Sequence, residues 1–128
     1  MSKKILLADD DESMVKLLDV ILKKDFEVTS TYSVQEAKSK LAESDYDAVI
    51  LDLNMPDENG FVLLDHIRNE LNHEWLPVIV LSGKEKSEDR IQSFQHKADD
   101  YLIKPFNPVE LRLRLDRLLS KYSILKSQ

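Results

Sequence analysis

The hydrophobic positions of this chain follow two patterns that alternate along its length. Continuous apolar runs such as Ile5-Leu6-Leu7-Ala8 and Ala48-Val49-Ile50-Leu51 have no helical period, which is typical of strands buried on both faces inside a parallel sheet. Another run, from Phe26 to Thr31, is half polar and is expected at a sheet edge. The runs predict strands at residues 5–8, 26–31, 48–52, 77–81 and 100–103.

Between these runs, apolar residues recur every three or four positions, as on one face of an amphipathic helix. Glu12 or Ser13 is expected to cap the first helix, and Pro108 suits the first turn of the last. Ser33 is expected to cap the second helix, with Glu36 in the capping-box position. The predicted apolar faces are Met14, Leu17, Leu18, Ile21 and Leu22; Val34, Ala37 and Leu41; Phe61, Leu64, Ile67 and Leu71; and Leu111, Leu115, Leu118 and Leu119. A further, charged helix is expected over residues 85–95.

Strands and helices therefore alternate five times, and this order predicts an α/β fold. Because the crossover connections are helical and right-handed, helices should cover both faces of the sheet. The expected architecture is a single doubly wound, five-stranded parallel sheet of the flavodoxin-like order 2-1-3-4-5, with five helices. In that order the first and third strands are neighbours at the switch point, where open α/β sheets bind ligands.

The composition narrows the class of protein. At 128 residues the chain is expected to form one domain. Its net charge of -6 and pI near 5.0 argue against direct nucleic-acid binding, which needs clustered basic residues. No apolar stretch approaches the length of a membrane span, so no membrane association is expected. The absence of cysteine excludes disulfides and thiolate metal sites, and it fits a reducing, cytoplasmic location.

Polar residues end four of the five predicted strands, and these ends should meet at one edge of the sheet. An isolated aspartate at such a place would ordinarily cap a helix or form a turn. The convergence of several polar side chains favours a functional site instead, with Asp52 at its centre. The residues are Asp9 and Asp10 after the first strand, Asp52 at the third, Ser82 at the fourth and Lys104 at the fifth.

Three carboxylates within a few ångströms repel one another, and a divalent cation would resolve the conflict. Hard oxygen ligands favour Mg²⁺, with Mn²⁺ as an alternative, while the lack of cysteine and of converging histidines argues against zinc. An aspartate beside such a metal is able to attack a phosphoryl group and form an acyl phosphate. Lys104 and the metal would neutralise the phosphoryl oxygens, and the Ser82 hydroxyl would donate a hydrogen bond to one of them.

These residues stand in a recognisable sequence pattern. Its parts are Asp9-Asp10; Asp52-Leu53-Asn54-Met55-Pro56; Ser82; and Tyr101 with Lys104-Pro105-Phe106. With this pattern the chain resembles the receiver domain of two-component response regulators over residues 3–121, which leaves residues 122–128 as a polar C-terminal tail. Five correctly ordered elements make the resemblance specific. It also implies a cis peptide bond between Lys104 and Pro105.

The resemblance implies that Asp52 accepts a phosphoryl group from a histidine kinase or a phosphotransfer protein. It implies that Asp10, Asp52 and the main-chain carbonyl of Asn54 bind Mg²⁺. Asp9 would act mainly through a metal-bound water, and Lys104 would contact the phosphoryl oxygens. The chain would then be a signalling phosphoacceptor rather than an enzyme, limited to phosphotransfer onto itself and autodephosphorylation.

By the same resemblance, phosphorylation would switch the surface formed by the fourth helix, the fifth strand and the fifth helix. The phosphoryl group would draw the Ser82 hydroxyl inward, and Tyr101 would turn into the space that it leaves. In the resting state Tyr101 is expected to lie half buried on an edge strand. The switched surface would pass the signal to a downstream effector protein or domain.

This surface also carries charges in positions that resemble those of regulators that dimerise symmetrically when phosphorylated. Leu113 points away from the apolar stripe of the last helix and is expected to be exposed, beside Ile91 or Phe94. A phosphorylation-linked homodimer and an ordinary solvated surface both fit these residues. The residues proposed for the dimer are Arg90, Asp99, Asp100, Glu110, Leu113, Arg114 and Lys121.

Two other functions stay open. An aspartyl-nucleophile phosphatase would share the fold class and the metal, but such an enzyme has a second acid two residues after the nucleophile, where this chain has Asn54. A pseudo-receiver that acts only as a docking scaffold would keep the fold but would not need every polar group at the strand ends. Both a stand-alone receiver and a piece of a longer regulator fit the short stretch after residue 121.

Overall fold

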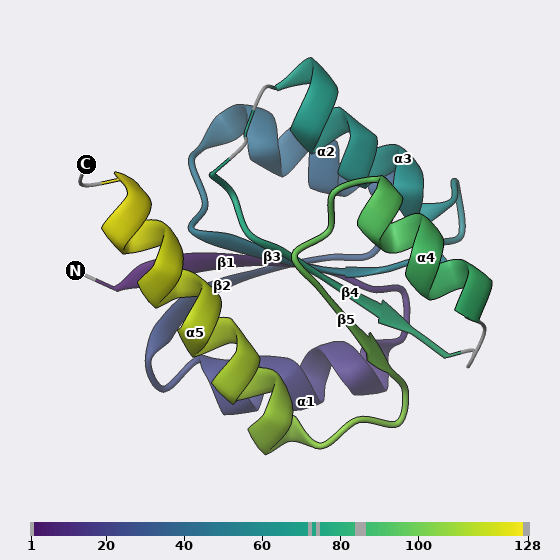
Figure 1. The fold of residues 1–128 in the computed structure, drawn as a ribbon. Coiled ribbons are helices and arrows are strands. Elements are labelled where there is room, and N and C mark those ends of the chain that lie inside the picture. The colour runs from purple at the N-terminus through teal and green to yellow at the C-terminus, as the bar shows by residue number, and fades with distance from the viewer. Residues whose placement is uncertain (1, 72, 74, 84–86, 127–128) are drawn as a thin grey trace.

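The computed structural model describes residues 2–71, 73, 75–83 and 87–126. These residues contain a sheet of five parallel strands in the order β2-β1-β3-β4-β5, as predicted (Figure 1). The strands are β1 (Lys3–Ala8), β2 (Phe26–Thr31), β3 (Ala48–Asp52), β4 (Val78–Ser82) and β5 (Asp100–Ile103). Because β2 is an edge strand, the half-polar run lies where it was expected.

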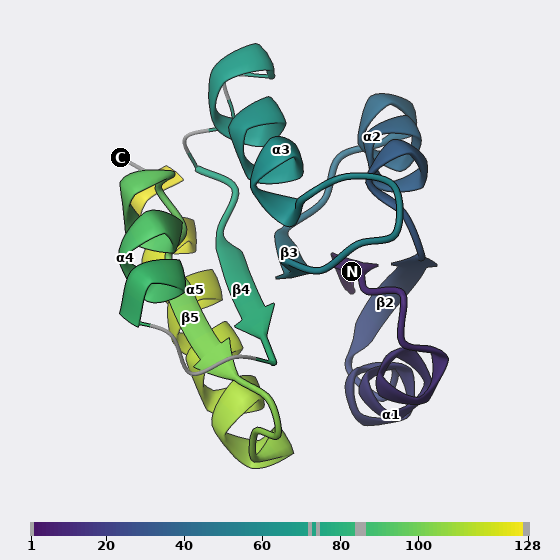
Figure 2. The ribbon, with the colours of Figure 1, turned by 90° about the vertical axis from the view of Figure 1, so that its right-hand side faces the viewer.

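Helices cover both faces of this sheet (Figure 1). One face carries α1 (Glu12–Leu22) and α5 (Pro108–Lys126), and the other carries α2 (Val34–Glu43), α3 (Gly60–Asp65) and α4 (Ser87–Gln95). A π-helical segment, η1 (His66–Glu70), continues α3. Figure 2 shows α1 beside the β2 edge of the sheet and α4 beside the β5 edge. The doubly wound α/β architecture with five helices is confirmed.

Each face of the sheet has its own hydrophobic core, because side chains alternate in direction along a strand. Leu6 and Val49 belong to the core beneath α2 and α3. Ile5 and Ile50, their neighbours in the chain, belong to the core beneath α1 and α5. All residues of β3 are buried, as predicted for the apolar run that ends at Asp52. The strand that carries Asp52 is therefore a fully enclosed support for a functional side chain.

The cap of α1 differs from its prediction. The N-cap is Asp11 rather than Glu12 or Ser13. The Asp11 carboxylate accepts hydrogen bonds from the main-chain N–H groups of Ser13 at 3.0 Å and Met14 at 3.3 Å. A carboxylate in this position also interacts favourably with the positive end of the helix dipole.

The buried face of α1 also differs from the predicted stripe. Val15, Leu18 and Leu22 are buried, whereas Leu17 is 45% exposed. Val15, Leu18 and Leu22 form the centre of the buried face, and Leu17 lies about 100° from Leu18 around the helix axis, outside that face. Leu18 packs against the sheet, and Leu17 remains at the surface.

The last helix continues into the expected polar tail, residues 122–128, and is helical as far as Lys126. Tyr122 anchors this extension, because its ring packs against the core beneath α1 and α5 and its hydroxyl donates a hydrogen bond to Asp99. Residues 127–128, like residues 85–86 of the predicted fourth helix, lie outside the described residues.

Candidate functional site

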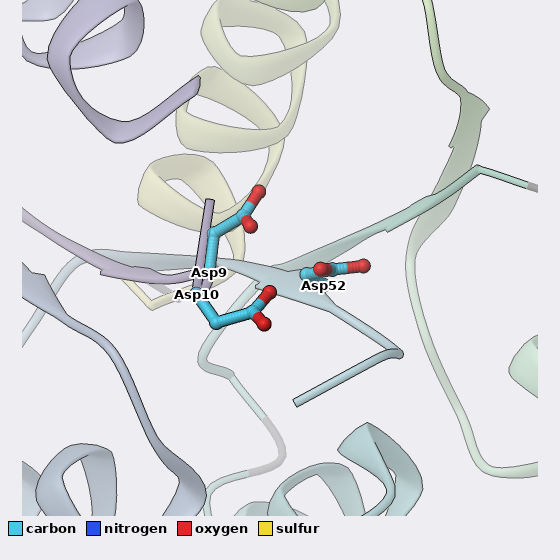
Figure 3. A group of neighbouring side chains, drawn as sticks. All are labelled: Asp9, Asp10 and Asp52. Atoms are coloured by element: carbon cyan, nitrogen blue, oxygen red, sulfur yellow. The ribbon is translucent and has the colours of Figure 1, made fainter. Parts of the chain in front are cut away.

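The three predicted acids meet at the carboxyl ends of β1 and β3. The two strands pair as far as Ala8 and Leu51, so Asp9 and Asp52 emerge side by side. Asp9 and Asp52 are buried, at 2% and 4% exposure, whereas Asp10 is exposed. One carboxylate oxygen from each of the three acids lies within 4.8 Å of the other two (Figure 3). The structure thus brings together the acids that the sequence pattern singled out.

β5 delivers a positive charge to this cluster. At its end, the main-chain N–H of Lys104 donates a hydrogen bond to the carbonyl of Ser82 at 2.6 Å. The Lys104 Nζ lies 2.8 Å from Asp9 Oδ2 and 3.4 Å from Asp52 Oδ2. The peptide bond from Lys104 to Pro105 is cis, as the resemblance implied. Lys104 therefore contacts both buried acids at once.

Burial and neighbouring charges shift the pKa values in this cluster, which holds more acidic than basic groups. Burial and the neighbouring Asp9 carboxylate raise the pKa of Asp52 to about 6, against the opposing effects of Lys104 and the N–H of Asn54. Burial disfavours the charged form of Lys104, but its hydrogen bond to Asp9 and the charge of Asp52 outweigh this and raise its pKa. Among the described residues, Lys104 is the lysine that contacts this cluster, and it meets two of the three acids, so negative charge is left over. The hard oxygen donors and this surplus charge fit a divalent cation such as Mg²⁺ or Mn²⁺.

The loop that follows β3 folds back toward the site. The N–H of Asn54 donates a hydrogen bond to Asp52 Oδ1 at 3.2 Å, and Asn54 pairs with Asn59 in an isolated antiparallel bridge. The N–H of Gly60 donates to the carbonyl of Leu53 at 2.8 Å. A Cβ atom on Gly60 would lie 2.6 Å from the carbonyl oxygen of Asp52, so only glycine fits there. The main chain of Asn54 is thereby held beside Asp52, while metal binding by its carbonyl stays a prediction.

The two predicted switch residues lie on the neighbouring strands. Ser82 is 1% exposed at the end of β4, one residue after the position that pairs with Asp52. Tyr101 on β5 is 7% exposed and belongs to the core beneath α2 and α3. It is thus more deeply buried than predicted, because α4 covers this edge of the sheet. The part of both residues in a switch stays a prediction.

Most residues proposed for a dimer lie at the surface. Leu113 is 64% exposed, as expected. Ile91 and Phe94 are also exposed. Arg90 and Lys121 are exposed as well.

Three of the charged residues of this surface are already paired with one another within the chain. Arg114 lies 2.7 Å from Asp100 and 2.9 Å from Glu110. A partner chain would have to compete with these ion pairs for the same guanidinium group.

Asp99 is an exception among the proposed dimer residues, because it points inward. Its side chain is 11% exposed and forms an ion pair with Arg68 at 2.9 Å. The same carboxylate accepts hydrogen bonds from the main-chain N–H of Val78 at 2.7 Å and from the Tyr122 hydroxyl. Burial and Asp99 raise the pKa of Tyr122 to about 12. Asp99 thus belongs to a largely buried network, and its part in a dimer stays a prediction.

The fold and the site together define a class: a doubly wound α/β protein with an acidic, lysine-containing site at its topological switch point. Comparison with known proteins makes this more specific. The response regulator receiver domain family matches residues 5–116, and the chain belongs to this family. Within the part of the chain that the structure describes, no helix has the length and apolar character needed to span a bilayer.

Two curated relatives from Staphylococcus aureus (strain NCTC 8325 / PS 47) illustrate the relationship. The transcriptional regulatory protein KdpE is 38% identical over 116 residues, which cover 90% of this chain and 49% of the relative. The transcriptional regulatory protein SrrA is 34% identical over 122 residues, which cover 94% of this chain and 49% of the relative. The chain therefore spans about half the length of these relatives.

Solved structures agree with this assignment. A CheY-like receiver domain protein from Methanospirillum hungatei JF-1 superimposes with a TM-score of 0.90 at 25% identity, covering 96% of this chain and 98% of the other. The receiver domain of the Francisella response regulator 1452 gives a TM-score of 0.87 at 30% identity, covering 94% and 98%. The predicted receiver fold is confirmed over nearly the whole chain.

Proposed function

We propose that Asp52 accepts a phosphoryl group, in the cytoplasm, from a phosphohistidine of a histidine kinase or a phosphotransfer protein. The contact of Lys104 with both Asp9 and Asp52 carries this proposal, because it places a cation beside a buried nucleophilic carboxylate. In the transfer, a bond forms between an Asp52 carboxylate oxygen and phosphorus, and the bond between phosphorus and the imidazole nitrogen breaks. Water later hydrolyses the acyl phosphate, which restores the carboxylate and releases inorganic phosphate. We propose no other substrate, so the chain is a signalling phosphoacceptor rather than an enzyme.

We assign distinct roles in this reaction to the polar residues near Asp52. Mg²⁺, or Mn²⁺ in its place, supplies when bound the positive charge that offsets repulsion between the acids and the phosphoryl oxygens. We assign the cation to the carboxylates of Asp10 and Asp52 and to the Asn54 carbonyl, and Asp9 to a water bound to it. Lys104, which already contacts both buried acids, neutralises phosphoryl oxygens.

The phosphoryl group acts on the rest of the domain through Ser82 and Tyr101. The Ser82 hydroxyl moves toward a phosphoryl oxygen, and the Tyr101 ring turns into the space that is vacated. The position of Ser82 on β4, which pairs with the Asp52 strand, and of Tyr101 on β5, which pairs with β4, supports this role. The altered α4-β5-α5 surface then binds a downstream effector protein or domain.

A symmetric homodimer is one way in which this surface would pass on the signal. Leu113 and the exposed apolar residues of α4 would supply its apolar contacts, and Arg90, Asp100, Glu110 and Arg114 its charges. Sedimentation of the chain with and without the phosphoryl mimic beryllofluoride tests this directly. A chain that remains monomeric at high concentration in both states would refute the dimer.

Intact mass spectrometry after incubation with acetyl phosphate and Mg²⁺ tests the phosphoacceptor role. The wild type should gain one labile phosphoryl group, and Asp52→Asn, treated in parallel, should gain none. EDTA in place of Mg²⁺ should prevent the adduct from forming. A folded wild-type protein that forms no adduct with any divalent metal would instead indicate a docking scaffold.

A further inference from the structure

The loop between β3 and α3 is fixed at a second place, away from the acids. Asp57, in this loop, directs its carboxylate to the start of α2. Its Oδ1 accepts a hydrogen bond from the main-chain N–H of Val34 at 2.9 Å, and its Oδ2 accepts one from the N–H of Gln35 at 3.1 Å. The next residue, Glu58, accepts a hydrogen bond from the Gln35 side chain at 3.2 Å. Three hydrogen bonds thus join the loop to a helix that lies elsewhere in the chain.

Both N–H groups belong to the first turn of α2, where no carbonyl of the helix is available to accept them. Ser33, directly before the helix, caps a third N–H group, that of Glu36, at 3.1 Å. Asp57 satisfies two more groups from a distant loop. The N–H groups of Val34 and Gln35 lower the pKa of Asp57, so its carboxylate remains charged at neutral pH and also benefits from the helix dipole.

The consequence lies a few residues earlier in the same loop. Asn54, which we assign to the metal through its carbonyl, is only three positions before Asp57, and its N–H contacts Asp52. Between Asn54 and Asp57 the chain passes through Met55, which is buried in the core, and Pro56, whose ring restricts the backbone. A short and stiff segment therefore connects the two.

We propose that Asp57 is a positioning residue for the metal site. By holding residues 54–57 against the N-terminus of α2, it keeps the Asn54 carbonyl in place to bind the cation. The inference rests on the proposed function, because it assumes that the acid cluster binds Mg²⁺. Since coupling between two sites is reciprocal, the cation in turn strengthens the hydrogen bonds from Val34 and Gln35 to Asp57.

Titration calorimetry of the full chain with MgCl₂ tests this proposal. Asp57→Ala is expected to weaken Mg²⁺ binding about tenfold, in the range found for groups that orient metal ligands. Asp57→Asn keeps an acceptor oxygen and should recover most of the affinity. Ser33→Ala is the matched control, because it removes a cap from the same helix without touching the loop. It should lower stability to urea much as Asp57→Ala does, yet bind Mg²⁺ like the wild type.

Amide hydrogen exchange supplies a second readout that does not depend on phosphorylation. In the wild type, Mg²⁺ should slow exchange at the N–H groups of Val34 and Gln35, and in Asp57→Ala it should not. Equal Mg²⁺ affinity of wild type and Asp57→Ala would overturn the positioning role and leave the proposed function intact. Equal weakening by Ser33→Ala would overturn it too, because helix stability would then explain the effect. A wild type that binds no Mg²⁺ would overturn both proposals.

Discussion

Replacing Asp52 with asparagine is expected to stabilise the folded protein, although it removes the proposed phosphoacceptor. In the native state, burial and the Asp9 carboxylate make the ionised form of Asp52 costly, and its pKa rises from 3.8 to about 6. The unfolded chain pays no such cost, because its Asp52 is surrounded by water. Asparagine has nearly the same shape and no charge, so Asp52→Asn removes the destabilising charge and keeps the packing.

The size of the effect follows from the pKa. A rise from 3.8 to about 6 corresponds to about 3 kcal/mol at neutral pH. Because the higher pKa belongs to the folded state, the native protein binds more protons than the unfolded chain between these two values, and its stability falls as the pH rises through them. The advantage of Asp52→Asn should therefore be complete at neutral pH, roughly half as large near pH 5 and small near pH 4.

Urea unfolding in EDTA, followed by the fluorescence of Trp75, measures this difference. Trp75 is the only tryptophan, and it precedes β4 at the end of the sheet opposite Asp52. Its ring meets that of Tyr122 edge-on, with 5.9 Å between the ring centroids, so it reports global unfolding. Asp45→Asn, at an exposed position before β3, is the control and should change stability by less than about 0.5 kcal/mol. Two results would refute the reasoning. The first is an Asp52→Asn variant that is no more stable than the wild type at neutral pH. The second is a stability gain that is as large near pH 4 as at neutral pH.

Three further substitutions test other parts of the structure. Asp99→Ala leaves the buried Arg68 guanidinium without its carboxylate and should lower the free energy of unfolding by about 3–5 kcal/mol in urea, whereas little change would contradict the buried network. Gly60→Ala places a methyl group 2.6 Å from the Asp52 carbonyl oxygen, so it should cost about 1–3 kcal/mol and weaken Mg²⁺ binding in calorimetry; normal stability and binding would argue against the close approach. Arg114→Ala removes two ion pairs at the surface and should cost under about 1 kcal/mol, yet it should prevent dimerisation with beryllofluoride in sedimentation. A dimer of unchanged affinity would exclude Arg114 from the interface.

The strands and the acid cluster were predictable because each depends on a local pattern and one general rule. An apolar run without helical period marks a buried strand, and parallel topology places the residues after each strand at one edge of the sheet. Asp9, Asp52 and Lys104 follow from these two steps, and the structure brings them into contact. No knowledge of side-chain packing was needed.

Features that arise from contacts between distant segments were not predictable in this way. Arg68, Asp99 and Tyr122 form a buried network, although each is 23 or 31 positions from its partner and resembles an ordinary surface residue in the sequence. The same limit applies to Asp57. Its local sequence is typical of a turn and gives no sign that its carboxylate caps a helix 22 or 23 positions earlier. For the cap of α1, a run of acids and a serine offers several equivalent candidates, and only the backbone geometry selects Asp11.

The charges of the site come from almost opposite ends of the chain. Asp9 follows β1 and Asp52 is the last residue of β3. Lys104 comes after β5, 95 positions beyond Asp9. During synthesis, both acids therefore leave the ribosome before the lysine does. A sheet assembled from β1, β2 and β3 alone would bury two repelling carboxylates without their cation. Docking of β5 relieves that repulsion, which favours completion of the whole sheet in one cooperative event over accumulation of its first half.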